Sequence, residues 1–199
     1  MEKLLKELDA CGEAITWAKN KTWNEIYSTC HRGDWLLWLF KRTNPNDIRL
    51  LTLAKAHCAN TVRHLMRDSR SIKAIDVAIA FGEGSATEEQ LQEAYIAAAI
   101  ATSVASTTAD SAAAYVASHA STTAAYAASA AASATYSVAA TAADSAAAEY
   151  AAAAAEYADS AYTTASTASA AYASRTKNQL ETADICRKYL PIEIWNINE

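Results

Sequence analysis

The sequence predicts an all-α protein, a multi-helix bundle in which alanine-rich helices pack closely against one another. Three observations support this fold class. Residues 97–174 are about half alanine and contain no glycine or proline, so helix propensity is high and no residue breaks a helix. The flanking segments repeat their apolar residues at helical spacing. Short sequences typical of helix N-termini precede several of those segments.

The alanine-rich tract, residues 97–174, is predicted to be helical because disordered tracts are usually rich in Pro, Gly, Gln and charge. A single helix over this length would extend on the order of 100 Å, too long for one compact domain, so we expect two to four helices. The expected breaks are polar clusters at 106–108, 121–123, Thr141 and 163–164. Tyrosines at 115, 126 and 136 are three helical turns apart and define one stripe, and a second series follows at 150, 157, 162 and 172.

The N-terminal part is predicted to contain three helices before the first proline. Apolar residues at helical spacing predict a helix over residues 2–19, and Thr22 is a candidate cap for a helix ending at Cys30. Asp34 is a candidate N-cap for a third helix over residues 35–40. This last segment is apolar on every side, which favours a buried core helix over an aromatic groove for a ligand.

The remaining helices are predicted from turns and caps. A turn at residues 44–47 and a capping box at 87–90 mark two of the starts. The expected spans are 48–66, from Ser69 or Ser71 to Phe81, from Thr87 into the alanine-rich tract, and 175–189. The last helix should place Leu180, Ala183, Cys186 and Leu190 on one side. Pro191 should end it, with residues 192–195 extended.

Residues 1–199 are expected to form one helical domain, because neither half looks able to build a core alone. It would comprise a Leu- and Trp-rich part (1–90), alanine-rich helices (91–174) and a closing helix with its tail (175–199). The net charge of −5 is uneven, since residues 74–174 contain ten acids and no Lys or Arg. This asymmetry suits a basic partner and argues against nucleic acid there.

The start of the sequence lacks the apolar core of a signal peptide, and no apolar run is long enough to cross a membrane. The four cysteines are scattered and form no CxxC pair. We therefore expect a cytoplasmic protein with free thiols and no membrane association.

The segment His57-Cys58 to His64 is the most suggestive cluster of reactive side chains. The two histidines are two helical turns apart, about 10 Å along the axis, too far to share one zinc from a straight helix. A metal- or thiol-dependent enzyme using His57, Cys58 and His64 remains an alternative. Hydrogen-bonded structural histidines are favoured, and neither a cofactor nor a catalytic residue is expected.

Four segments together carry a resemblance to a known family. They are Arg32-Gly33-Asp34-Trp35-Leu36-Leu37-Trp38-Leu39, residues 53–65, residues 80–84 and residues 182–190. As a set they resemble the immunity proteins of bacterial polymorphic-toxin systems, which also carry an alanine- and tyrosine-rich middle. The resemblance implies a protein that binds and neutralises a cognate toxin in the producing cell. It implies no catalytic residues.

The leading functional hypothesis is therefore a non-enzymatic binding protein that blocks a basic toxin by stoichiometric contact. The expected contact residues are the acids of the tract: Asp110, Asp144, Glu149, Glu156 and Asp159. A basic face around Arg63, Arg67 and Arg70 is the alternative surface. A structural or ice-binding alanine-rich protein is a further alternative, ranked last because its threonines are clustered and not regularly spaced.

Overall fold

The computed structural model describes residues 1–66, 68–107 and 167–197. Within these residues every regular element is a helix and there is no strand, so the all-α fold class is confirmed. Residues 108–166 lie outside the described part, and with them all the predicted breaks of the alanine-rich tract except the first. The two ends of the tract are helical as predicted, within α7 (Glu88–Thr107) and α10 (Thr167–Tyr189).

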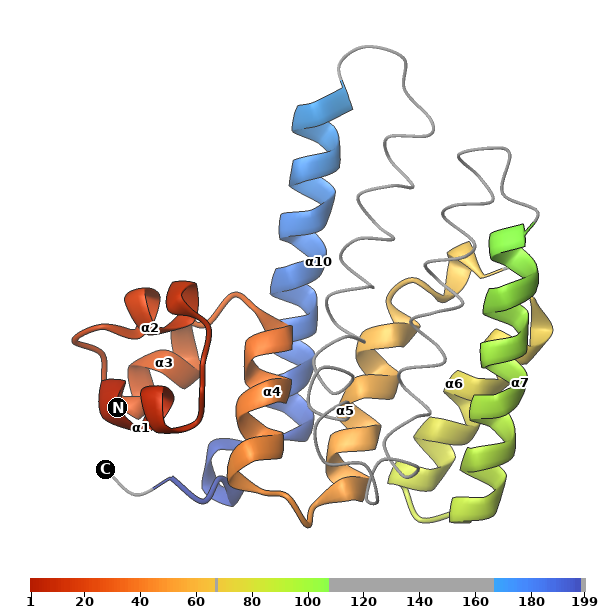
Figure 1. The fold of residues 1–199 in the computed structure, drawn as a ribbon, viewed down its shortest axis with the longest axis horizontal. Helices are drawn as coiled ribbons and strands as arrows, with labels where there is room; N and C mark the ends of the chain where they lie inside the picture. The colour runs from red at the N-terminus through yellow and green to blue at the C-terminus, as the bar shows by residue number, and fades with distance from the viewer. Residues whose placement is uncertain (67, 108–166, 198–199) are drawn as a thin grey trace.

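In the described part of the chain, five helices form the body (Figure 1). These are α4 (Gly33–Thr43), α5 (Ile48–Asn60), α6 (Ser69–Gly82), α7 and α10. Along the chain α5 packs on α6 and α6 packs on α7, whereas α10 packs against both α4 and α5. The C-terminal helix α10 therefore packs against two helices from the N-terminal half of the chain.

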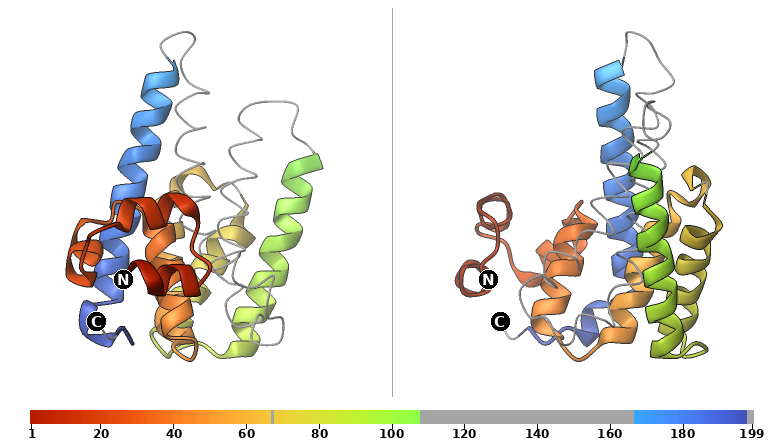
Figure 2. Two further views of the ribbon diagram at one scale, coloured as in Figure 1. Left: turned by 60° about the vertical axis from the view of Figure 1, so that its left-hand side comes forward. Right: turned by 45° about the vertical axis from the view of Figure 1, so that its right-hand side comes forward.

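Three short helices add a layer beside α4. They are α1 (Glu2–Glu7), α2 (Gly12–Ala18) and α3 (Trp23–Thr29). In Figure 1 and the right-hand view of Figure 2 they lie on the outer side of α4, away from α6 and α7. Two 3₁₀ turns, η1 (Arg63–Leu65) and η3 (Ile192–Ile194), complete the described elements.

The predicted helix over residues 2–19 is wrong, because the chain turns between α1 and α2. Asp9 has a φ of 60°, a left-handed conformation that Asp tolerates better than most residues. Cys11 is extended, and α2 begins at Gly12. The turn allows Leu5 of α1 and Ala18 of α2 to be buried in the same core.

Capping accounts for several helix starts. Thr22 and Glu25 form the reciprocal capping box that begins α3, and Thr87 and Gln90 exchange the same pair of hydrogen bonds before α7. Asp34 was predicted to cap α4 but does not, because that helix begins at Gly33, two residues earlier than predicted, and its N-cap residue is Arg32. The Asp34 carboxylate is instead occupied by the Arg32 guanidinium.

Three other predicted boundaries are corrected. Helix α5 ends at Asn60 and not at Met66, because the chain turns there and buries Val62 and Met66 against α6. Helix α10 starts at Thr167, earlier than the predicted residue 175. The segment after Pro191 is a 3₁₀ turn and not extended.

The buried face of α10 also differs from the prediction at one position. Asn178, Thr182, Cys186 and Leu190 recur every fourth residue and are all buried, whereas Leu180 is 47% exposed. A stripe at this spacing leaves a residue two positions from Asn178 on the opposite side of the helix.

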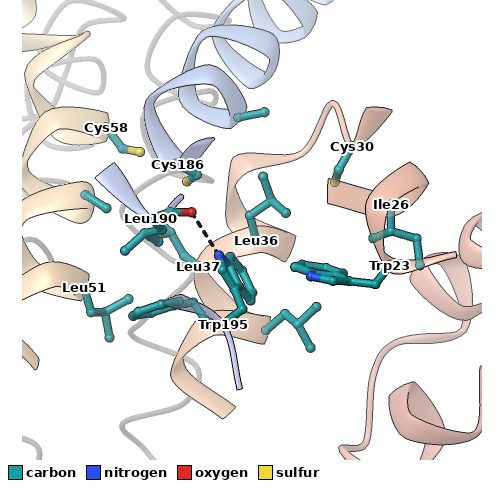
Figure 3. Packing of buried hydrophobic residues seen from close by; sticks show 14 of the residues in the cluster. Trp23, Ile26, Cys30, Leu36, Leu37, Leu51, Cys58, Cys186, Leu190 and Trp195 are labelled. Carbon is teal, nitrogen blue, oxygen red and sulfur yellow. Dashed lines mark hydrogen bonds between the residues drawn. The ribbon is translucent and has the colours of Figure 1, made fainter. Parts of the chain in front are cut away.

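Among the residues that the structure describes, the buried side chains form two clusters. The alanine core lies between α5, α6 and α7 and contains Ala56, Ala59, Val62, Met66, Ala74, Ile75, Ala78, Phe81, Leu91, Ala94 and Ala98. The aromatic core joins α1–α4 to α5, α10 and the C-terminal segment, with Trp23, Phe40, Leu36, Leu37, Leu190 and Trp195 among its members. Figure 3 shows Trp195 between Trp23 and Leu190, with its indole N–H donating to the Leu190 carbonyl at 2.9 Å.

Two glycines permit close helix contacts. A Cβ on Gly82 would lie 2.5 Å from Cβ of Leu53, and one on Gly33 would lie 2.7 Å from the Thr182 carbonyl carbon. The first contact brings α6 against α5, and the second brings the start of α4 against α10. Any side chain at either position would push the two helices apart.

Candidate functional site: a tryptophan pocket

The acidic residues predicted to contact a partner, Asp110, Asp144, Glu149, Glu156 and Asp159, lie outside the described residues. Arg67 of the alternative basic face lies outside them too. The two remaining arginines of that face pair locally, Arg63 with Asp76 at 2.5 Å and Arg70 with Asp68 at 2.7 Å.

The three residues of the enzyme alternative occupy different environments. His57 is partly buried and stacks on Tyr189, with ring centroids 4.1 Å apart and planes 6° apart. Burial, followed by the nearby Lys188 ammonium, lowers the pKa of His57. Cys58 is fully buried, with its thiol 3.7 Å from the Thr182 carbonyl, whereas His64 is exposed in η1.

All four cysteines are free thiols, and only Cys11 is exposed. Burial raises the pKa of Cys30 to about 11, and burial beside Cys58 raises that of Cys186 well above its usual range. In residues 1–66, 68–107 and 167–197, no three His, Cys, Asp or Glu side chains lie together in a way that could hold a metal ion.

A cavity lies between α4 and the layer of short helices, and we call it the tryptophan pocket. Its volume is about 330 Å³. The α1–α2 turn, α2, α3 and α4 all contribute to its wall. Its lining includes the apolar residues Leu5, Ile26, Leu36, Leu39, Trp17, Trp35 and Trp38 and the charged residues Asp9, Glu13, Arg32 and Asp34.

Aromatic rings dominate one side of the pocket. The Trp17 and Trp35 rings lie 5.8 Å apart, and the His31 ring lies 6.0 Å from Trp17 and 6.2 Å from Trp35. Trp38 follows Trp35 by three residues, which places both on one face of α4. All four rings are only partly buried. Part of this aromatic surface is therefore in contact with solvent.

Cations already lie over these rings. Arg32 lies 4.9 Å from the Trp35 centroid, Lys21 lies 4.4 Å from that of Trp17, and Arg42 lies 5.6 Å from that of Trp38. Such contacts arise because the ring face carries partial negative charge. The tryptophan pocket is therefore an environment that attracts positive groups.

The charges of the pocket are unevenly neutralised. Arg32 donates two hydrogen bonds to Asp34, from Nε at 2.8 Å and from Nη2 at 2.6 Å. Glu13 approaches Arg32 only to 3.9 Å, and its side chain is 73% exposed. Asp9 is also exposed at the α1–α2 turn. Two carboxylates therefore remain open to solvent at the rim.

The prediction that residues 35–40 are buried on every side is correct only in part. Leu36, Leu37, Leu39 and Phe40 are buried, but Trp35 and Trp38 are exposed enough to line the pocket. The sequence signal for this face was the i, i+3 pair of tryptophans with Arg42 four residues after Trp38. The contribution of Trp17, from a different helix, had no such local signal.

No protein-family model matches the chain, and searches of curated proteins and of solved structures likewise find no match. None of the helices in the described part of the chain is long and apolar enough to span a membrane.

Proposed function

We propose that this protein binds another protein through the tryptophan pocket and acts as a stoichiometric inhibitor, an immunity protein that neutralises a cognate bacterial toxin in the cytoplasm. The observation that supports binding most directly is the pocket itself. It combines partly exposed tryptophans with an arginine, the residue types that contribute most to the energy of protein interfaces.

The architecture of the pocket suits a protein side chain. A volume of about 330 Å³ is at the small end of the range for small-molecule sites. It is adequate for one anchoring side chain from a partner. The bidentate Arg32–Asp34 pair fixes one wall, so little side-chain order has to be gained on binding.

The positions of His57, Cys58 and His64 favour binding over catalysis. A nucleophilic thiol must be reachable and ionisable, and Cys58 has no exposed surface. The His57 ring is engaged with Tyr189, and His64 projects from a separate turn. These residues are better explained as structural groups of the α5 region than as a catalytic set.

Protection of cells that express the proposed cognate toxin tests the proposal. If inhibition is stoichiometric, protection should reach its half-maximum near equal amounts of the two proteins and should survive His57→Ala and His64→Ala in folded variants. Trp35→Leu should weaken toxin binding at least tenfold, because it removes an exposed aromatic anchor.

Tyr95→Leu is the matched control, since Tyr95 is also a partly buried aromatic residue but belongs to α7 on the other side of the molecule. It should leave toxin binding unchanged. Protection at a small fraction of the toxin concentration, lost with His57→Ala, would instead indicate an enzyme. Equal binding by wild type and Trp35→Leu would show that the tryptophan pocket is not the contact surface.

A further inference from the structure

The tryptophan pocket is lined by buried apolar residues in its interior and by exposed charged residues at its rim. Leu5, Ile26, Leu36 and Leu39 are each at most 5% exposed and form the apolar part. Asp9 and Glu13, by contrast, are exposed. An occupant that matches both parts needs an apolar stem and a polar end, which is the design of a long charged side chain.

The charges of the lining set the sign of that end. The pocket contains three carboxylates and one guanidinium, a net charge of −2, and Arg32 is already bound to Asp34. The Asp9 side chain makes no hydrogen bond or ion pair in the described structure, and Glu13 has only its long contact with Arg32. An anionic occupant would meet repulsion at this rim, whereas a cation would gain two carboxylate partners.

The protein's own side chains show how such an occupant would be held. Lys21 and Arg32 each place a cationic group over a tryptophan of this cluster, at 4.4 Å from the Trp17 centroid and 4.9 Å from the Trp35 centroid. Each of Trp17, Trp35 and Trp38 is only partly buried and so keeps some accessible ring surface beside the cation that already lies over it.

From these observations we infer that the tryptophan pocket binds a lysine or arginine side chain of a basic protein partner. Its methylene groups lie against the tryptophans and leucines, and its charged end lies at Asp9 and Glu13. The inference rests on the proposed function for the identity of the partner, and it supplies the chemistry of the contact. It also places the acidic contact for a basic toxin in the first forty residues.

Binding of short peptides to the purified full chain tests the inference. The probe is acetyl-Gly-Arg-Gly-amide, and its matched control is the same peptide with citrulline, which keeps the shape of arginine but is neutral. The indole N–H signals of the five tryptophans report the position of binding by NMR. Trp17, Trp35 and Trp38 should shift, while Trp23 and Trp195, buried in the aromatic core, serve as internal references.

The arginine peptide should bind at least tenfold more tightly than the citrulline peptide, and added salt should reduce this ratio. Glu13→Gln and Asp9→Asn should each weaken arginine binding severalfold and leave citrulline binding unchanged. Asn tolerates the left-handed backbone at position 9, so the second variant should keep the turn. Glu93→Gln, an exposed glutamate of α7, removes the same charge elsewhere and should have no effect.

Equal affinity for the arginine and citrulline peptides, or shifts spread over all five tryptophans, would overturn the inference. The proposed function fails in a different way. If the arginine peptide binds as expected but Trp35→Leu still protects cells fully against the toxin, the pocket is a cation site whose partner is another basic protein. If Trp35→Leu abolishes protection while neither peptide is preferred, the toxin uses the pocket with a neutral anchor.

Discussion

The alanine core and the aromatic core hold their helices together in different ways. The alanine core brings α5, α6 and α7 close through small side chains such as Ala56, Ala78 and Ala98, all without exposed surface. Each methyl contributes only about 0.8 kcal/mol on burial, so stability is distributed over many contacts. The aromatic core depends on a few large rings, each of which buries on the order of 150–250 Å².

This difference predicts opposite sensitivities to substitution. The aromatic core should be damaged most by truncation, because a missing ring leaves a cavity. The alanine core should be damaged most by enlargement, because the backbones are already in contact. Helix α10 contributes residues to the aromatic core and α7 to the alanine core, so the helices that contain the two ends of the alanine-rich tract belong to different cores.

The largest expected effect is that of truncating the aromatic core. Phe40→Ala should lower the free energy of unfolding by about 3–5 kcal/mol, because Phe40 has no exposed surface and its ring lies 5.1 Å from that of Trp195. Chemical denaturation measures the change. Trp38→Ala, on the same helix, should cost clearly less, since this ring is partly exposed at the pocket.

The Trp38→Ala variant also tests the sequence-based prediction that residues 35–40 are buried on every side. If that prediction held, Trp38→Ala would lower the free energy of unfolding as much as any other truncation in the core. Equal losses for Phe40→Ala and Trp38→Ala would mean that the tryptophan pocket is closed in solution.

Enlargement at the close contact of α5 with α6, beside the alanine core, should lower stability less. Gly82→Ala places a methyl group 2.5 Å from Cβ of Leu53 and 2.9 Å from its Cα, so α5 and α6 must separate. We expect a loss of about 1–3 kcal/mol in thermal or denaturant unfolding. Gly12→Ala is the matched control, because a Cβ there meets nothing within 4 Å. An unchanged or slightly raised stability for both variants would contradict the close packing of α5 on α6.

Removal of the N-terminal caps of α3 and α7 should lower the free energy of unfolding by the same amount. Thr22→Ala and Thr87→Ala each delete the side-chain oxygen that accepts a backbone N–H at the start of a helix, at 3.3 Å in both cases. The expected loss is about 1 kcal/mol each, because a cap is a local interaction. A much larger loss for one of them would show that its helix start also supports the neighbouring core.

The smallest expected effect is a pH dependence at His57, at the border of the two cores. Its pKa in the folded protein is lowered, first by burial and then by Lys188, while Glu83 opposes the change. The folded state therefore favours the neutral ring. This contribution to stability is complete above the unfolded-state pKa of about 6.5, and it is lost as the pH falls through the lower folded-state pKa.

Melting temperatures of the wild type and of His57→Phe at pH 7.5 and pH 5 should reveal the contribution of His57 protonation to stability. The phenyl ring can stack on Tyr189 but cannot take up a proton. The variant should lose less stability on acidification than the wild type. The same loss in both proteins would assign the pH dependence to carboxylates elsewhere.

The parts of the fold that could be predicted from the sequence were those set by local chemistry. Thr22 was identified as a helix cap and residues 87–90 as a capping box, because caps depend only on residues close together in the sequence. The prediction that Asp34 caps α4 failed at a carboxylate that is bound by Arg32, two residues earlier in the chain. The turn at Asp9 could not be predicted from the residue type alone. Each error arose where a charged partner or a tertiary contact overrode a local preference.

The candidate site was less predictable than the fold. Trp35 and Trp38 were visible as an aromatic run, but whether a ring is buried or lines a pocket depends on which helix covers it. Trp17 joins them only because α2 folds back beside α4. The acids of the tract, from Asp110 to Asp159, were singled out by composition alone, and they remain a prediction.

The position of α10 between α4 and α5 has a consequence for the order in which the protein folds. Thr167 lies 107 positions after Asn60, so α4 and α5 are synthesised long before the helix that covers them. At about 5–20 residues per second, this interval lasts on the order of ten seconds. During that time α5, α6 and α7 have all their mutual contacts available, whereas Phe40, Leu36 and Leu37 lack Leu190 and Trp195. We therefore expect the nascent chain to assemble its alanine core first and to keep an apolar surface on α4 that chaperones can recognise.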